Sequence, residues 1–273
     1  QAHIPTLLVT SPTNLFYLTG ITCPPHELRL IVTPTTHHLF YSPLLKPQPR
    51  PQPFPKSLTI WLNRHKLNTL HFEPQAFTVT DLIKFKPLLH PIRLKPAPTL
   101  IENLRLIKHK SEIIALAAAC RLAANAVNYL KTFIQPGMTE KDITWAVEQY
   151  FHQHNSTPAF STIIASGPNS AIPHYQTGNR KIKSPDIVLI DLGCKVKGYC
   201  SDITRVIFIG SPTPQQHQLY DLVKSAHAAA LSALKKTRPS YKDGSCSGQT
   251  TDRAARNVIT AAGYGDHFVH GTG

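Results

Sequence analysis

The sequence predicts two domains, an α/β domain followed, from about Pro96 to Ser111 onward, by a domain of longer helices and a β-hairpin. Three observations favour this organisation. Short apolar segments alternate with short helical stretches up to Pro96, which is the pattern of an α/β domain. Longer helical periodicities then begin, and two apolar strand segments joined by a short turn lie within residues 187–209.

In the first domain, we expect strands at residues 7–10, 30–33, 38–41 and 69–72, and helices near residues 14–18, 58–65 and 79–88. The proline-dense segment 46-KPQPRPQPFPK-56 interrupts this pattern. In polyproline II geometry it could bind a proline-recognition domain. An exposed, stiff connection is the more common role of such a segment, and we expect that role here.

In the second domain, a helix is expected from Ser111 to Ile134, because an apolar-periodic run begins at Ser111-Glu112 and Pro136-Gly137 ends it. Further helices are expected over residues 139–154, 214–236 and 250–262. The segments 136–151 and 239–259 occupy equivalent places in the order of elements, which indicates an internal repeat.

Two aspartates, Asp191 and Asp202, lie in these otherwise apolar strand segments. A turn centred near Val196-Lys197 would place them opposite each other, with Cβ atoms roughly 4.5–5.5 Å apart, and a bulge at Gly198 would shift this register by one residue. Because like charges repel at that spacing, either one carboxyl holds a proton or a cation lies between them. Two divalent metals roughly 3.5–4 Å apart would fit, and would activate a water for hydrolysis. The alternative is that each aspartate caps a turn or pairs with a lysine.

Composition excludes several classes of protein. The five cysteines are scattered and odd in number, which argues against a disulfide framework and for a reducing compartment. The net charge of +14 comes from dispersed lysines and arginines without a basic run, so we expect no nucleic-acid partner. The most apolar stretch, residues 113–130, is interrupted by Arg121, Asn125 and Asn128, so we expect no membrane span. No secretory signal is recognised, and a cytoplasmic location is expected.

Four further motifs accompany the two aspartates in a fixed order: 7-LLVTSPTNLFYLTGI-21, 104-LRLIKHKSEI-113, 165-ASGPNSAIPHY-175 and 268-FVHGTG-273. With them the chain resembles the metallopeptidases of the Xaa-Pro dipeptidase and aminopeptidase P group. The resemblance implies a creatinase/prolidase-like N-terminal α/β domain over residues 1–103, followed by an incomplete α+β metallopeptidase catalytic domain of the pita-bread fold over residues 104–273. Both ends of the chain look cut.

The resemblance also assigns roles to residues. Asp191 and Asp202 match two of the ligands of a dinuclear metal site. Independently of the resemblance, Thr204 lies on the same strand face as Asp202, and its hydroxyl is expected to orient the carboxylate. His174 and His270 match the two catalytic histidines beside the substrate. The remaining ligands, a histidine and two glutamates that include the general base, would fall after Gly273.

The function that we expect is therefore hydrolysis of the Xaa-Pro peptide bond, in dipeptides or at the N-terminus of peptides, by a hydroxide that bridges two divalent metals. Manganese is the expected metal, with cobalt or zinc as alternatives, and a homodimer is the expected assembly. The second hypothesis is a non-catalytic relative that binds peptides or other partners. A creatinase-like amidinohydrolase is disfavoured by the two aspartates, and a methionine aminopeptidase by the whole first domain.

Overall fold

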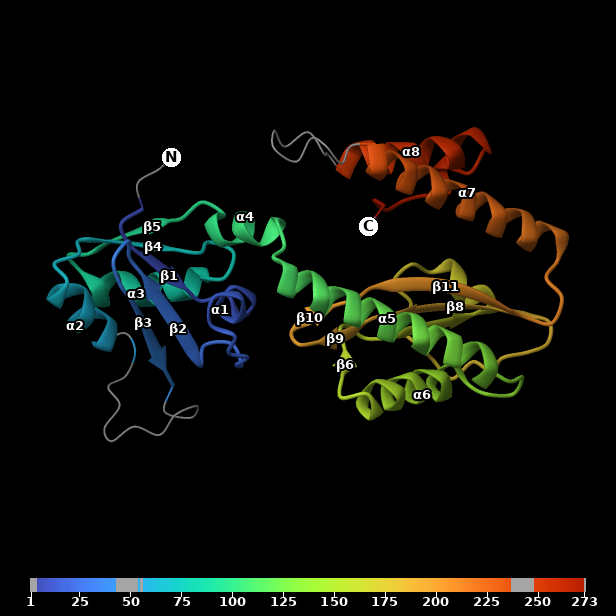
Figure 1. The fold of residues 1–273 in the computed structure, drawn as a ribbon, viewed down its shortest axis with the longest axis horizontal. Helices are drawn as coiled ribbons and strands as arrows, with labels where there is room; N and C mark the ends of the chain where they lie inside the picture. Colours follow the sequence, from blue (N-terminus) through green and yellow to red (C-terminus); the bar gives the residue numbers. More distant parts are fainter. Residues whose placement is uncertain (1–3, 43–53, 55, 237–247, 273) are drawn as a thin grey trace. The chain divides into compact units, whose positions relative to one another are not determined.

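The structure, a computed structural model, describes residues 4–42, 54, 56–236 and 248–272 (Figure 1). It divides into two compact units. The first contains Gln1–Ala119 together with Lys195–Ser201, and the second contains Cys120–Cys194 together with Asp202–Gly273. The short segment 195–201 is the tip of the predicted aspartate hairpin, so this tip packs within the first unit.

The first unit contains a five-stranded sheet with the strand order β3-β2-β1-β4-β5. Strand β1 pairs antiparallel with β2 and parallel with β4, and β4 pairs parallel with β5, so helices are needed as crossovers. The strands are β1 (Leu7–Val9), β2 (Leu28–Val32), β3 (His37–Tyr41), β4 (Thr69–Phe72) and β5 (Arg93–Pro96). The helices are α1 (Pro12–Thr19), α2 (Lys56–Arg64), α3 (Val79–Leu89) and α4 (Leu100–Leu106).

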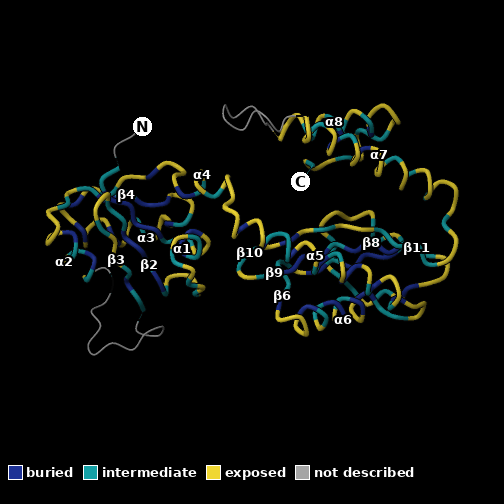
Figure 2. Tube along the Cα trace, viewed as in Figure 1, coloured by how far each residue is buried: buried dark blue, intermediate teal, exposed yellow. Residues whose placement is uncertain are grey.

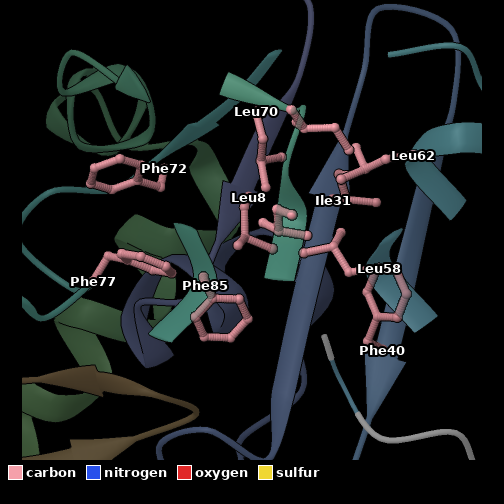
Figure 3. Packing of buried hydrophobic residues seen from close by; sticks show 11 residues of the cluster. Leu8, Ile31, Phe40, Leu58, Leu62, Leu70, Phe72, Phe77 and Phe85 are labelled. Carbon is pink, nitrogen blue, oxygen red and sulfur yellow. The ribbon is translucent and has the colours of Figure 1, made fainter. Parts of the chain in front are cut away.

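The alternation of side chains in β1 explains how both faces of this sheet are covered. Leu8 packs into a cluster with Leu58 and Leu62 of α2 and Phe85 of α3 (Figure 3). Its neighbours Leu7 and Val9 point to the opposite face, into a second cluster that includes Leu15 of α1. Burial of such aliphatic and aromatic side chains stabilises by about 1.5–3 kcal/mol each.

The second unit contains a three-stranded antiparallel sheet with the order β11-β8-β7, so β8 is its central strand. Figure 2 shows its strands as largely buried or intermediate segments. The strands of the second unit are β6 (Thr157–Pro158), β7 (Ile163–Ser166), β8 (Asp186–Leu192) and β11 (Ile203–Ile209). The hairpin tip contributes β9 (Cys194–Val196) and β10 (Tyr199–Cys200), which lie almost entirely in the segment assigned to the first unit. The helices are α6 (Glu140–Gln153), α7 (Pro214–Lys236), α8 (Gly248–Ala261) and the part of α5 (Lys110–Phe133) that follows Ala119, with short 3-10 turns at Gly167–Ala171 and Gly265–His267.

One face of β8 is fully buried and the other is not. Val188, Ile190 and Leu192 have no exposed surface, whereas Asp191 on the opposite face is half-buried. The buried face belongs to a core that includes Ile143, Val147 and Phe151 of α6, a helix that packs against β7. The half-buried face is therefore the one that carries the candidate site.

Helix α5 is long and apolar enough to cross a membrane by length and composition, which the sequence analysis did not expect. Its buried residues Ala123, Ala126, Val127 and Leu130 belong to the core of the second unit. Core helices of folded domains meet the same criterion, so the helix alone is weak evidence for a membrane span.

The elements expected from the sequence are present. The helix α4 and the strands β5, β6 and β7 were not expected, and β5 shows why such a strand is hard to recognise. That strand, β5, is short and has only one apolar residue of the kind that marks buried strands, Leu94. The expected domain boundary after Asn103 falls inside α4. Most of the proline-dense segment 46–56, and the first half of the second repeat copy at 239–259, lie outside the described residues.

Candidate metal and substrate site

The aspartate hairpin has a register different from the expected one. Asp191 pairs with Thr204, and the ladder continues to Ile203 opposite Leu192. The turn residues are Lys197 and Gly198, which both have positive φ, at 49° and 83°. Two positive φ values are the requirement of a type I′ two-residue turn, and a β-branched valine resists them, so the turn lies one residue later than expected.

As a result, Asp202 is not directly opposite Asp191 but is its diagonal neighbour, because it lies two positions before Thr204. Diagonal neighbours on one face lie roughly 7–8 Å apart at Cα, still within reach of a shared ligand. The Thr204 hydroxyl donates a hydrogen bond to Asp191 Oδ1 at 3.1 Å. The structure therefore brings Asp191, Asp202 and Thr204 to one edge of the hairpin.

Asp191 is the electrostatically perturbed member of this group. Burial is the largest influence and raises its pKa above the ordinary value; the hydrogen bond from Thr204 opposes the shift, the charge of Asp202 adds to it, and the charge of His174 opposes it. The charges of both residues thus act on the Asp191 carboxyl. A half-buried carboxylate beside a like charge is in a position that a divalent cation would stabilise.

His174 lies in an exposed part of the segment between β7 and β8. This segment is anchored by Glu140, the first residue of α6, which has no exposed surface. The Glu140 carboxylate accepts hydrogen bonds from Ser166, Asn169, Tyr175 and Gly178. The anchors lie on both sides of His174 in the chain.

An ion pair between Arg180 and Asp186 continues this network to β8. Arg180 donates to the Ser166 hydroxyl at 2.5 Å and to both carboxylate oxygens of Asp186 at 2.7 and 3.3 Å. Burial would raise the pKa of Asp186, but hydrogen bonds from Arg180 and from the backbone of Lys183 and Ile187 outweigh it and lower the pKa. Asp186 begins β8, so the network joins the segment that bears His174 to the strand that bears Asp191.

The backbone around His270 is held by a separate set of hydrogen bonds, made by two side chains of α8. Arg256 donates to Asp252 within the helix and to the carbonyl oxygens of Phe268 and His270, at 2.7 and 2.8 Å. Asp252 in turn accepts from the backbone N–H of Thr272 at 2.8 Å. The hydrogen bond from Arg256 is the main reason that the pKa of Asp252 lies far below its ordinary value. None of the contacts described for His270 reaches the two aspartates.

The chemistry of this donor set fits part of a metal site. Asp191 and Asp202 offer only oxygen ligands, which suit fairly hard divalent ions. Among the residues that the structure describes, no group of three or more His, Cys, Asp and Glu side chains gathers to hold a metal. The pair would therefore supply two ligands of a larger set.

Sequence reasoning missed the anchoring residues Glu140, Arg180, Asp252 and Arg256. One signal was available, because Thr139-Glu140-Lys141-Asp142 indicates a helix start, and Thr139 and Asp142 do form a capping box. The helix-start signal accounts for the carboxylate of Asp142, which caps the helix, but it gives no role to the carboxylate of Glu140. The partners of Glu140 lie 26 to 38 residues away, so only the folded chain reveals its role.

The fold and the paired carboxylates define the class of protein, a metallopeptidase with the pita-bread fold. Residues 115–273 match the model of metallopeptidase family M24, and residues 1–107 match that of the creatinase/prolidase N-terminal domain. The chain belongs to metallopeptidase family M24.

Relatives are known by sequence and by structure. The chain is 33% identical over 208 residues to the uncharacterized peptidase YqhT of Bacillus subtilis, an alignment that covers 76% of this chain and 57% of that relative. It is 30% identical over 277 residues to an uncharacterized peptidase of Staphylococcus saprophyticus, covering 97% of this chain and 77% of that relative.

Among solved structures, the chain is similar to the Xaa-Pro dipeptidase from Bacillus anthracis, with a TM-score of 0.85, 26% identity, and coverage of 98% of this chain and 76% of that one. The prolidase from Pyrococcus furiosus gives a TM-score of 0.82 at 29% identity, covering 98% of this chain and 78% of that one. The expected family and fold are confirmed.

Proposed function

We propose that the full-length protein containing this chain hydrolyses the peptide bond that precedes proline, using divalent metals held in part by Asp191 and Asp202. The observation that carries the proposal is the pair of carboxylates on neighbouring arms of the hairpin, with the Thr204 hydroxyl bonded to Asp191. The charge of His174 also acts on the pKa of Asp191. Membership of a metallopeptidase family supports it. So do the structural relatives, which are named as an Xaa-Pro dipeptidase and a prolidase.

Each residue has a proposed task in this reaction. Asp191 and Asp202 hold metal, and the Thr204 hydroxyl fixes one oxygen of Asp191 so that the other can face the metal. His174 and His270 act on the substrate side, as proton relays or as donors to the developing oxyanion. Bound metals would supply an activated water and polarise the scissile carbonyl. An X-Pro bond has no amide hydrogen to hold, so recognition must rely on the ring and on the carbonyl.

The finer parts of the proposal rest on the family resemblance. They are a two-metal site with manganese as the preferred ion and cobalt or zinc as alternatives, a bridging hydroxide as nucleophile, a homodimer and a cytoplasmic location. The further ligands, a histidine and two glutamates, would be supplied by chain that follows Gly273.

The test is a peptidase assay of the full-length protein, first stripped with a chelator and then reloaded with manganese, cobalt or zinc. An Xaa-Pro dipeptide and an Xaa-Pro-Yaa tripeptide are compared with the matching Xaa-Ala peptides. We expect metal-dependent cleavage of the proline peptides only, and the preferred length separates a dipeptidase from an aminopeptidase. Binding of proline peptides without cleavage under any metal would overturn the proposal and favour a binding module.

A further inference from the structure

We propose that Glu140 is a positioning residue that holds the segment 166–178 and thereby sets the place of His174 beside Asp191. The proposal rests on the proposed function for the role of His174 and goes beyond it by naming what holds that histidine. Glu140 touches neither aspartate in the described contacts, so it would act only through the segment.

The buried Glu140 carboxylate accepts five hydrogen bonds from the segment. One carboxylate oxygen, Oε1, accepts from the Ser166 N–H and hydroxyl, both at 2.7 Å, and from the Asn169 amide at 3.0 Å. The other, Oε2, accepts from the Tyr175 hydroxyl at 2.8 Å and the Gly178 N–H at 3.1 Å. All five donors belong to the segment between the end of β7 and residue 178.

The charge state favours a rigid anchor. Burial would raise the pKa of Glu140, but the hydrogen bonds from Asn169, Ser166 and Tyr175 together outweigh it and lower the pKa. The carboxylate is therefore ionised at neutral pH, and its place at the start of α6 is also stabilised by the helix dipole. Hydrogen bonds to a charged acceptor are roughly twice as strong as neutral ones, so five of them hold the segment firmly.

The side chain of His174 is exposed and is not held by packing around it. The position of His174 therefore depends on the hydrogen bonds that hold the rest of the segment. Ile172, Pro173 and His174 are exposed, whereas Tyr175 is partly buried. The segment is closed by hydrogen bonds from the Ile172 N–H to the Asn169 carbonyl at 3.1 Å and from the Tyr175 N–H to the Ile172 carbonyl at 3.2 Å. Asn169 and Tyr175 also share a hydrogen bond at 2.8 Å. Asn169 and Tyr175 both donate to the Glu140 carboxylate, so a shift of that carboxylate would shift the turn that carries His174.

The test compares Glu140→Gln with Asp142→Asn. The glutamine keeps the shape but turns an NH2 group towards at least two of the donors, whereas Asp142→Asn weakens the capping box of the same helix without touching the segment. Amide hydrogen exchange over residues 164–178 is measured in the full-length protein. We expect exchange about 10-fold faster or more in Glu140→Gln, and exchange near that of the wild type in Asp142→Asn.

Kinetics then test the link to His174. Because a misplacement of about 1 Å can cost about 100-fold in rate, we expect Glu140→Gln to lower kcat by about 10- to 100-fold with little change in KM. In a His174→Ala background, Glu140→Gln should lower kcat by a further factor of less than about 3, because the histidine that Glu140 positions is already absent. Tyr175→Phe removes one of the five donors to Glu140, together with the hydrogen bond that the Tyr175 hydroxyl accepts from Asn169, and serves as a milder second variant should Glu140→Gln fail to fold.

The outcomes separate the two proposals. If the wild type cleaves no Xaa-Pro peptide, the proposed function fails, and the exchange measurement alone still decides whether Glu140 holds the segment. Equal exchange in Glu140→Gln, Tyr175→Phe and Asp142→Asn overturns the anchoring role. Fully multiplicative losses in the Glu140→Gln/His174→Ala double variant overturn the action through His174.

Discussion

The half-buried carboxylate of Asp191 is the residue on which the candidate site depends. Its raised pKa means that its ionised form costs stability in the metal-free protein. That cost is present above the folded pKa and disappears as the pH falls below the ordinary aspartate value, where the side chain is protonated in both states. A bound divalent cation would remove the cost by pairing with the charge.

Asp191→Asn and Asp202→Asn test this site directly. In the full-length protein, either change should abolish Xaa-Pro hydrolysis and lower the metal content. Without metal, Asp191→Asn should raise the free energy of unfolding at pH 7, and the gain should shrink as the pH falls towards about 4. Metal analysis and urea unfolding measure both effects. Near-normal activity with full metal occupancy in either variant would show that the two-aspartate site is wrong.

Gly198 offers a second test at the scale of one residue. It has φ of 83°, and a Cβ there would collide with the Phe16 ring. Gly263 has almost the same φ, 84°, with nothing within 4 Å of a Cβ, so it is a matched control. Gly263→Ala should cost about 1–2 kcal/mol from the left-handed backbone, and Gly198→Ala about 1–3 kcal/mol more from the collision. Urea unfolding measures both losses, and equal values would mean that Phe16 yields freely.

At the scale of elements, each of the two histidines proposed to act on the substrate, His174 and His270, lies in a segment tied to a helix by a carboxylate. Glu140 of α6 holds the segment of His174 through its own oxygens. Asp252 of α8 holds the segment of His270 together with Arg256, whose guanidinium also lies 4.4 Å from the centre of the Phe268 ring. Because helices are stiff, these hydrogen bonds fix the two histidine-bearing segments relative to α6 and α8.

Asp252→Asn should loosen the segment 268–272, because it weakens the acceptor of the Thr272 N–H and of Arg256. The control is Asp221→Asn on α7, which removes an exposed pair with His217 at the same i,i+4 spacing. We expect faster amide exchange at Thr272 and altered His270 ring resonances in the first variant only. The same response in both variants would mean that the pair is merely a surface ion pair.

At the scale of the whole molecule, the balance of charge predicts sensitivity to acid. Hydrogen bonds lower the pKa values of Glu140, Asp142 and Asp186 below the ordinary values of 4.5 for Glu and 3.8 for Asp. Groups of this kind stabilise the fold fully above those values, and the stabilisation is lost as the pH falls through the lower folded values. The net charge of +14 adds repulsion as carboxylates become neutral.

We therefore expect the free energy of unfolding to fall steadily between about pH 4.5 and pH 2, with little change between about pH 5.5 and pH 7. Asp186→Asn should flatten the acid part of this curve, while a substitution of the exposed Asp221 should leave it unchanged. Urea unfolding across this pH range measures the slopes. Constant stability down to about pH 3 would contradict the shifted pKa values of these carboxylates.

The 273-residue chain by itself should bind metal only weakly, because its described residues bring together two carboxylates and no larger ligand group. We expect no Xaa-Pro hydrolysis from it, and calorimetric titration with manganese should give an affinity weaker than micromolar. The full-length protein is the control. Submicromolar affinity, or turnover comparable to that control, would mean that the ligand set lies within these residues.

The sequence by itself determined most of the elements and supplied the residues proposed for the site. Apolar periodicity placed the helices and most strands within one to two residues, because burial of a regular face needs a regular pattern. The aspartates in apolar strands pointed to a metal site, since unpaired charge is costly there. The weakly patterned strand β5 had no such signal and was missed.

Only the tertiary structure decided the register and the anchors. The hairpin turn moved by one residue to place Lys197 and Gly198 at positive φ, which set Thr204 rather than Asp202 opposite Asp191. Local sequence could not settle this, because Gly198 also has to lie against Phe16, far away in the chain. The roles of Glu140 and Asp252 could not be predicted from the sequence either, because a carboxylate there is indistinguishable from a solvated surface charge until the fold brings its hydrogen-bond donors together. Hydrogen-bond partners 20 to 38 residues apart are determined by packing, and packing is a property of the folded chain.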